Sequence, residues 1–93
     1  KHIGYSITKS GVIGLTKYLG TYLAPKIRVN AIVPGGVENG QDEKFIKNYS
    51  RNTPLNRMMQ KEEIIGICKY LASDDSSYST GSLFNVDGGW SSW

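Results

Sequence analysis

Residues 27–36 read IRVNAIVPGG, and this stretch indicates the fold more clearly than any other part of the chain. β-branched residues mix with partial alternation over residues 27–33, which is typical of a short strand. The run then stops at Pro34, Gly35 and Gly36, which end a strand in a tight loop. We therefore predict a strand at 27–33 that is buried on both faces, as the strands of a parallel sheet are.

Two segments on either side of this strand carry helical patterns. Apolar residues recur at helical spacing from Tyr5 to about Ala24, and Pro25 follows the run as a proline just past a helix end does. Residues 61–72 repeat the pattern, with two glutamates in the first turn, where the helix dipole favours negative charge. Both segments are predicted to be helices.

Two shorter elements complete the alternation. Residues 42–50 fit a short helix, interpreted as a lid, that ends before the break at 52–54, and residues 82–87 (SLFNVD) fit a last strand before two glycines. Alternating helices and short buried strands are typical of an α/β fold with a parallel sheet. Two strands are too few for such a sheet, so the predicted class is the C-terminal part of a doubly wound, Rossmann-like domain.

Composition excludes several classes of protein. The chain has 93 residues, a formal net charge of +3 and one cysteine, Cys68. One cysteine excludes an internal disulfide, so a reducing cytoplasm is the expected compartment. No apolar run approaches the ~20 residues that span a bilayer. A membrane is therefore not an expected partner, and because the basic residues are scattered and not clustered, a nucleic acid is not one either.

Tyr5 and Lys9 lie four residues apart within the first predicted helix. Four residues make just over one helical turn, so both side chains project from the same face. A tyrosine, with an ordinary pKa of about 10, is a poor acid–base catalyst at neutral pH, and a nearby ammonium stabilises its phenolate. By spacing alone, the pair fits either a catalytic pair or an exposed tyrosine with a lysine one turn away.

Three motifs in the chain resemble those of the short-chain dehydrogenase/reductase family. YSITK (5–9) is similar to the family's Tyr-x-x-x-Lys motif, and IRVNAIVPGGV (27–37) is similar to its strand and Pro-Gly loop. LASDDSSYSTGSLFNVDGGW (71–90) resembles its C-terminal signature. The resemblance implies an oxidoreductase that transfers a hydride between NAD or NADP and the carbonyl/alcohol pair of a small substrate. It also implies that Tyr5 exchanges a proton with the substrate oxygen, assisted by Lys9, which hydrogen-bonds the nicotinamide ribose.

The loop after the predicted strand lies at its carboxyl end, where open α/β sheets bind ligands. Pro34 fixes a turn, and Gly35 and Gly36 let the backbone approach a ligand closely. By resemblance, Val37 offers its backbone amide and carbonyl to the nicotinamide carboxamide. The family commonly has threonine where this chain has Asn39, whose side-chain amide would donate to a cofactor phosphate. The alternative interpretation is a plain glycine-rich turn.

Other features of the family have no match in the chain. Its Gly-rich dinucleotide fingerprint, catalytic serine and structural asparagine lie before the Tyr-x-x-x-Lys helix. The resemblance therefore implies that residues 1–93 are the C-terminal portion of a single NAD(P)-binding domain, inactive alone. The competing hypothesis is an incomplete fragment that acts only as a folding or interaction module.

The glycines of the first predicted helix bear on assembly. Gly11 and Gly14 permit close helix packing, and the family's assembly implies a homodimer or homotetramer.

The remaining conspicuous residues receive structural interpretations. Cys68 lies on the apolar face of its helix and is predicted to be a core residue. Asp87, beside two glycines, is predicted to be a structural turn carboxylate, and His2 a loop residue. The sequence leaves Trp90 and Trp93 open between core and interface.

Overall fold

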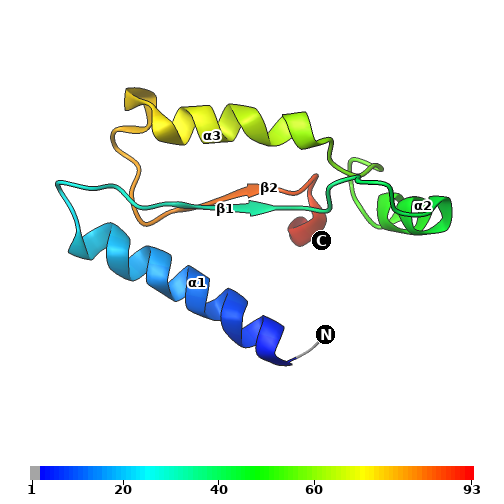
Figure 1. Ribbon diagram of the computed structural model, residues 1–93, viewed down its shortest axis with the longest axis horizontal. Coiled ribbons are helices and arrows are strands. Elements are labelled where there is room, and N and C mark those ends of the chain that lie inside the picture. The colour runs from blue at the N-terminus through cyan, green and yellow to red at the C-terminus, as the bar shows by residue number, and fades with distance from the viewer. Residues whose placement is uncertain (1–2) are drawn as a thin grey trace. The chain divides into compact units, whose positions relative to one another are not determined.

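The computed structural model describes residues 3–93, so the interpretation of His2 lies outside the described residues (Figure 1). The helices and strands, in chain order, are α1 (Ile3–Tyr22), β1 (Ala31–Pro34), α2 (Glu43–Arg51), α3 (Ile65–Ala72) and β2 (Leu83–Val86). Short 3₁₀ turns lie at Lys61–Ile64 (η1), Asp74–Ser76 (η2) and Trp90–Ser92 (η3). β1 and β2 pair in parallel, which confirms the predicted α/β class.

The chain divides into two compact units. The first contains the residues up to 31 together with 70–84, and the second contains residues 32–69 and 85–93. In the first unit, helix α1 lies on one side of the strand starts and the end of α3 on the other (Figure 1).

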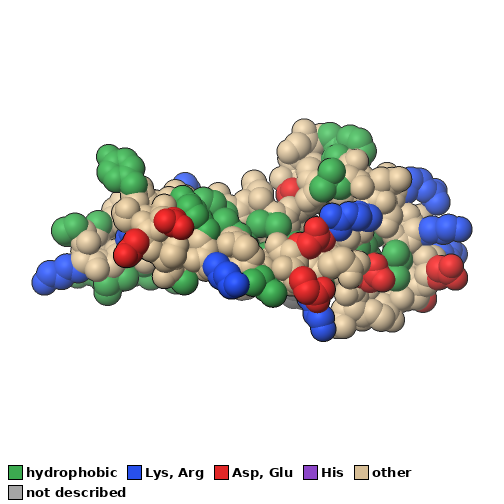
Figure 2. Space-filling model, turned by 90° about the horizontal axis from the view of Figure 1, so that it is seen from above, with side chains coloured by type: hydrophobic (Ala, Val, Ile, Leu, Met, Phe, Trp, Pro, Cys, Tyr) green, Lys and Arg blue, Asp and Glu red, His purple; other side chains and the backbone are tan. Residues whose placement is uncertain are grey.

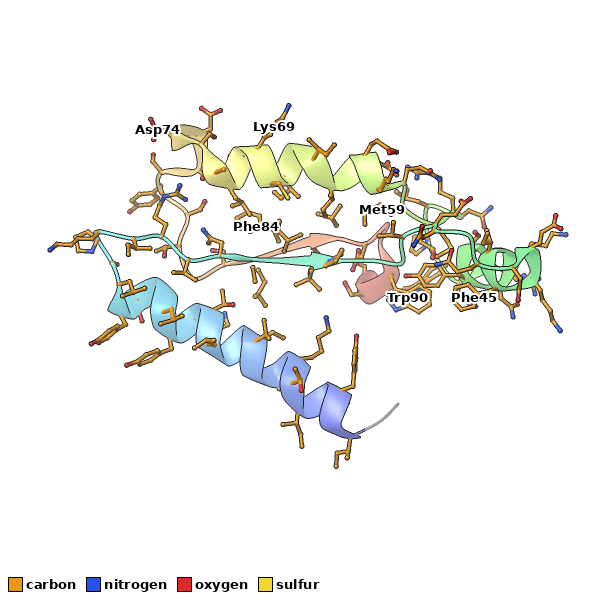
Figure 3. All side chains as sticks on the ribbon, in the orientation of Figure 1. Phe45, Met59, Lys69, Asp74, Phe84 and Trp90 are labelled. Atoms are coloured by element: carbon orange, nitrogen blue, oxygen red, sulfur yellow. The ribbon has the colours of Figure 1, made fainter. Side chains whose placement is uncertain are left out.

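Close backbone contact joins α1 to the loop before β2 within the first unit. A Cβ atom on Gly20 would lie 2.5 Å from the Gly81 Cα, and the Thr80 hydroxyl donates to the Gly20 carbonyl at 2.8 Å. On the other side of β2, Phe84 projects towards α3 and meets the Tyr70 ring edge-on, with centroids 6.3 Å apart (Figure 3). Helix α1 thus packs against the loop before β2, and the end of α3 packs against β2 itself.

β1 begins four residues later than the predicted strand at 27–33. Side chains make several of the hydrogen bonds in this stretch, although the Gly81 amide donates to the Val29 carbonyl at 2.7 Å: the Asn30 side-chain amide donates to the Ser79 carbonyl at 2.9 Å. The Asn30 side-chain oxygen accepts from the Ser82 backbone amide at 3.1 Å. The prediction of burial on both faces is also wrong, since residues 31–33 are only half-buried. Among the described residues, β2 is the only strand beside β1.

Helix α2 is fixed within the second unit by its cap and by aromatic stacking. The Asp42 carboxylate accepts from the Phe45 amide at 2.8 Å, the hydrogen bond of an N-cap residue. The Tyr49 ring stacks on Trp90 at 4.6 Å and on Phe45 at 6.2 Å, and Figure 3 shows these two side chains beside α2. Trp90 therefore packs against its own chain, although part of its surface is exposed.

The described residues bury very little apolar surface. Met58, 2% exposed, is their only buried hydrophobic side chain. Helix α1 instead exposes a series of large apolar side chains: Ile3, Tyr5, Ile7, Val12, Ile13, Leu15, Tyr18 and Tyr22. Trp93 is exposed as well. Cys68 is also exposed, so its prediction as a core residue is wrong. Helical periodicity identifies an apolar face of a helix but does not show which residues cover that face.

The surface charges agree with the scattered pattern of the sequence. Both basic and acidic side chains lie on the face shown in Figure 2. Within residues 3–93 no helix is long and apolar enough to cross a bilayer. The same residues contain no cluster of histidine, cysteine and carboxylate groups suited to a metal ion.

Candidate active site

Tyr5 and Lys9 lie together on the first turns of α1, in the first unit. The Lys9 Nζ atom is 5.5 Å from the centroid of the Tyr5 ring, within the range of a cation–π contact. The Tyr5 side chain is 52% exposed. The helix thus brings the predicted pair together on an accessible face, with the ammonium beside the aromatic ring.

The loop after β1 is held in the second unit by a contact that the sequence did not predict. Val37 forms a parallel bridge with Met59: the Met59 amide donates to the Gly36 carbonyl, and the Glu38 amide donates to the Met59 carbonyl, both at 2.9 Å. In such a bridge the amide and carbonyl of the central residue point away from the partner segment. The two Val37 groups expected to meet a carboxamide therefore lie on the open side of the bridge.

A carboxamide of the chain itself lies on that open side. The Gln41 side-chain nitrogen donates to the Val37 carbonyl at 3.0 Å, and the Gln41 side-chain oxygen accepts from the Asn39 amide at 2.7 Å. The Val37 carbonyl thus already receives the kind of donor that a nicotinamide carboxamide carries. The Val37 carbonyl is therefore an acceptor that suits the NH₂ of a carboxamide. Sequence reasoning missed Gln41, whose only signal is its position two residues after Asn39 in the same loop.

Gly35 and Gly36 are required by packing within the second unit. A Cβ atom on Gly35 would lie 2.9 Å from the Asp87 Cα, and one on Gly36 would lie 2.5 Å from the Tyr49 ring. The Gly36 amide also donates to the Tyr49 hydroxyl. Close approach at both glycines is therefore made by the chain itself, and their contact with a ligand stays a prediction. Pro34 ends β1 in an exposed position.

A cavity of about 80 Å³ lies beneath this loop, and every residue that lines it belongs to the second unit. Arg57 and Glu63 line it and form a two-armed ion pair, with N–O distances of 2.7 and 2.8 Å. This hydrogen-bonded pairing, with the Gln60 amide, lowers the pKa of Glu63 to about 2.

Asp87 closes the turn after β2, as predicted from the sequence. Its carboxylate accepts from the Ser91 hydroxyl at 2.7 Å and from the Gly89 amide at 3.0 Å. These hydrogen bonds, chiefly that of Ser91, lower the pKa of Asp87 below its ordinary value. An ionised carboxylate with these partners is a structural group, and the structure confirms that interpretation.

The parallel α/β fold is that of Rossmann-like domains. A family model described as enoyl-(acyl carrier protein) reductase matches residues 1–91. The chain belongs to the short-chain dehydrogenase/reductase family. It is 43% identical over 91 residues to the 3-oxoacyl-(acyl-carrier-protein) reductase FabG of Thermotoga maritima, covering 91% of this chain and 37% of that protein.

Solved structures agree with this assignment. A short-chain dehydrogenase from Leptospira borgpetersenii with bound NAD+ is 46% identical, with a TM-score of 0.87, over 92% of this chain and 34% of that one. A structure from Agrobacterium tumefaciens with bound NADP is 38% identical, with a TM-score of 0.86, over 96% of this chain and 39% of that one. The chain spans 37% of the length of the curated relatives from Mycobacterium tuberculosis that it matches.

Proposed function

We propose that this chain is the C-terminal portion of a single NAD(P)-binding domain in an oxidoreductase that acts on the carbonyl/alcohol pair of a small substrate. The observation that carries the proposal is the Tyr5–Lys9 pair on one face of α1, with 5.5 Å between ammonium and ring, in a member of this family. The NAD+ and NADP bound to its structural relatives support the choice of cofactor.

The proposed chemistry assigns proton transfer to Tyr5. The nicotinamide, when bound, supplies or accepts the hydride. In the reducing direction the substrate carbon accepts the hydride, and the Tyr5 hydroxyl donates its proton to the substrate carbonyl oxygen. The substrate becomes an alcohol, and Tyr5 becomes a phenolate. The Lys9 ammonium stabilises that phenolate and also donates to a hydroxyl of the nicotinamide ribose. In the oxidising direction the Tyr5 phenolate takes the proton from the alcohol.

The loop after β1 is proposed to bind the nicotinamide end of the same cofactor. Val37 would pair its amide and carbonyl with the carboxamide, Pro34 and Gly35 would shape the turn, and Asn39 would donate to a phosphate. The exposed position of Asn39 and the orientation of the Val37 bridge support these roles.

The setting of the enzyme is proposed from the same observations. The single cysteine supports a cytoplasmic location, and the exposed apolar side chains of α1 support a homodimer or homotetramer. Residues 1–93 alone would be inactive, since Met58 is the only apolar side chain that the described residues bury. The same small core favours the second candidate function, a fragment that acts only as a folding or interaction module.

Turnover by the whole protein distinguishes these two functions. Reduced NAD and reduced NADP are each incubated with the protein and a panel of small ketones and aldehydes, and loss of the reduced nicotinamide absorbance is followed. The oxidoreductase proposal expects substrate-dependent oxidation of at least one cofactor, and equilibrium binding of that cofactor. A whole protein that binds neither dinucleotide contradicts the proposal and leaves the interaction module as the better account.

A further inference from the structure

Gln41 places a side-chain carboxamide on the loop that is proposed to bind the nicotinamide. Its nitrogen donates to the Val37 carbonyl at 3.0 Å and its oxygen accepts from the Asn39 amide at 2.7 Å, so both ends of the group are engaged. Gly40, between them, has a φ of +76°, a left-handed conformation that glycine adopts without strain. This conformation lets the chain turn so that the half-buried Gln41 side chain lies over Val37.

A glutamine side chain and a nicotinamide share one functional group. Each presents a carbonyl acceptor and an NH₂ donor in one plane. In the proposed function the Val37 carbonyl receives the NH₂ of the nicotinamide, and in the structure it receives the NH₂ of Gln41.

We propose that the Gln41 carboxamide is an internal substitute for the nicotinamide carboxamide: it holds the Val37 carbonyl in the cofactor-free protein and is displaced when the cofactor binds. This inference rests on the proposed function. Gln41 occupies the Val37 carbonyl, one of the two groups on the open side of the bridge, and it competes with the nicotinamide for that carbonyl. In this proposal the hydrogen bond from Gln41 to the Val37 carbonyl is exchanged for one from the nicotinamide NH₂.

Removing the Gln41 donor is expected to strengthen binding of the nicotinamide end alone. The Gln41→Met variant of the whole protein is titrated calorimetrically with its dinucleotide, and then with the same molecule lacking nicotinamide, ADP-ribose or its 2′-phosphate. One net hydrogen bond corresponds to a dissociation constant about two- to tenfold lower for the dinucleotide, with ADP-ribose binding unchanged. Gln60→Met is the matched control, since the Gln60 side chain contacts Glu38 and not Val37, and it should change neither constant.

A second variant keeps the inference testable if Gln41→Met does not fold. Gln41→Glu retains an acceptor for the Asn39 amide but has no N–H to donate to Val37, so the ratio of dinucleotide to ADP-ribose affinity should again rise. A ratio that stays constant or falls in the folded variants overturns the inference while the proposed function stands. A wild-type protein that binds no dinucleotide overturns both.

Discussion

Lys9 has two proposed roles at the scale of the single residue, and one substitution separates them. Lys9→Met removes the ammonium that lies 5.5 Å from the Tyr5 ring while keeping an unbranched side chain. We expect turnover to fall by about a hundredfold or more, and cofactor affinity by about tenfold, because a charged hydrogen bond to the ribose is lost. Cofactor titration measures the second effect. Unchanged cofactor affinity would remove the ribose role, and Lys17→Met on the same helix is the control.

Glu63 gives a prediction about pH at the same scale. Its pKa falls from 4.5 to about 2 because Arg57 and the Gln60 amide hydrogen-bond its charged form. A carboxyl whose pKa is lower in the folded state stabilises the fold above its unfolded pKa. The contribution is therefore complete above about pH 5 and is lost as the pH falls through 4.5 towards 2. An NMR titration of the carboxyl carbon should show this pKa, and Arg57→Gln should return it towards 4.5. If the pKa of Glu63 were the same in Arg57→Gln as in the wild type, the assigned cause of the shift would be wrong.

Single residues also show what the sequence could predict about the site. The proximity of Tyr5 and Lys9 was predictable, because a helix fixes the distance between residues four apart. The contact of Gln41 with Val37 was not, because it depends on the left-handed conformation of Gly40. The bridge from Val37 to Met59 joins residues that no local pattern relates.

Arg28 organises the end of α3 at the scale of the element. Its guanidinium donates to four backbone carbonyls, those of Leu71, Ser73, Ser76 and Ser79, at 2.7–3.3 Å. Carbonyls at the end of a helix have no partner within it, and a cation there also complements the helix dipole. These contacts fix the path of the chain from α3 through η2 towards β2.

We expect Arg28→Lys to lower the free energy of unfolding by about 2 kcal/mol, because lysine keeps the charge but lacks the planar fork that reaches several acceptors. Urea unfolding of the whole protein measures the change, with the exposed Arg51→Lys in α2 as the control. If Arg28→Lys is as stable as the wild type, the contacts of Arg28 do not hold this segment.

The existence and order of the elements followed from periodicity, but their ends did not. The first strand begins late because Asn30 and Thr80 take hydrogen bonds with their side chains, which a hydrophobic pattern does not register. The helix predicted at 61–72 begins with the 3₁₀ turn η1, and α3 starts at Ile65. In both cases side-chain and backbone hydrogen bonds at the ends decided the boundary.

At the scale of the whole molecule, the exposed face of α1 predicts assembly. A Cβ atom on Gly11 or Gly14 would meet no described residue within 4 Å beyond its chain neighbours and the backbone of α1, and Val12 and Leu15 beside them are exposed. Apolar surface of this kind usually lies at an interface. Light scattering of the whole protein at micromolar concentration should give a dimer or tetramer, and Val12→Lys should dissociate it. A monomeric mass for the wild type would contradict this prediction.

The sequence predicted the fold class, the parallel pairing and the family of the whole molecule, but not its burial. Helical periodicity marks Cys68 and the α1 residues as apolar faces, and the structure leaves both exposed. Periodicity within a helix identifies its apolar face, but the residues that would cover this face belong to other segments and cannot be predicted from that helix alone.

The central claim is that Tyr5 transfers the proton, and Tyr5→Phe tests it most directly. The substitution removes only the hydroxyl, so turnover of the whole protein should fall by at least about a hundredfold. Cofactor affinity should stay nearly unchanged. Tyr18→Phe is the matched control, because Tyr18 lies on the same helix and is 59% exposed, close to the 52% of Tyr5. Near-normal turnover by a folded Tyr5→Phe variant would show that the proton comes from another group.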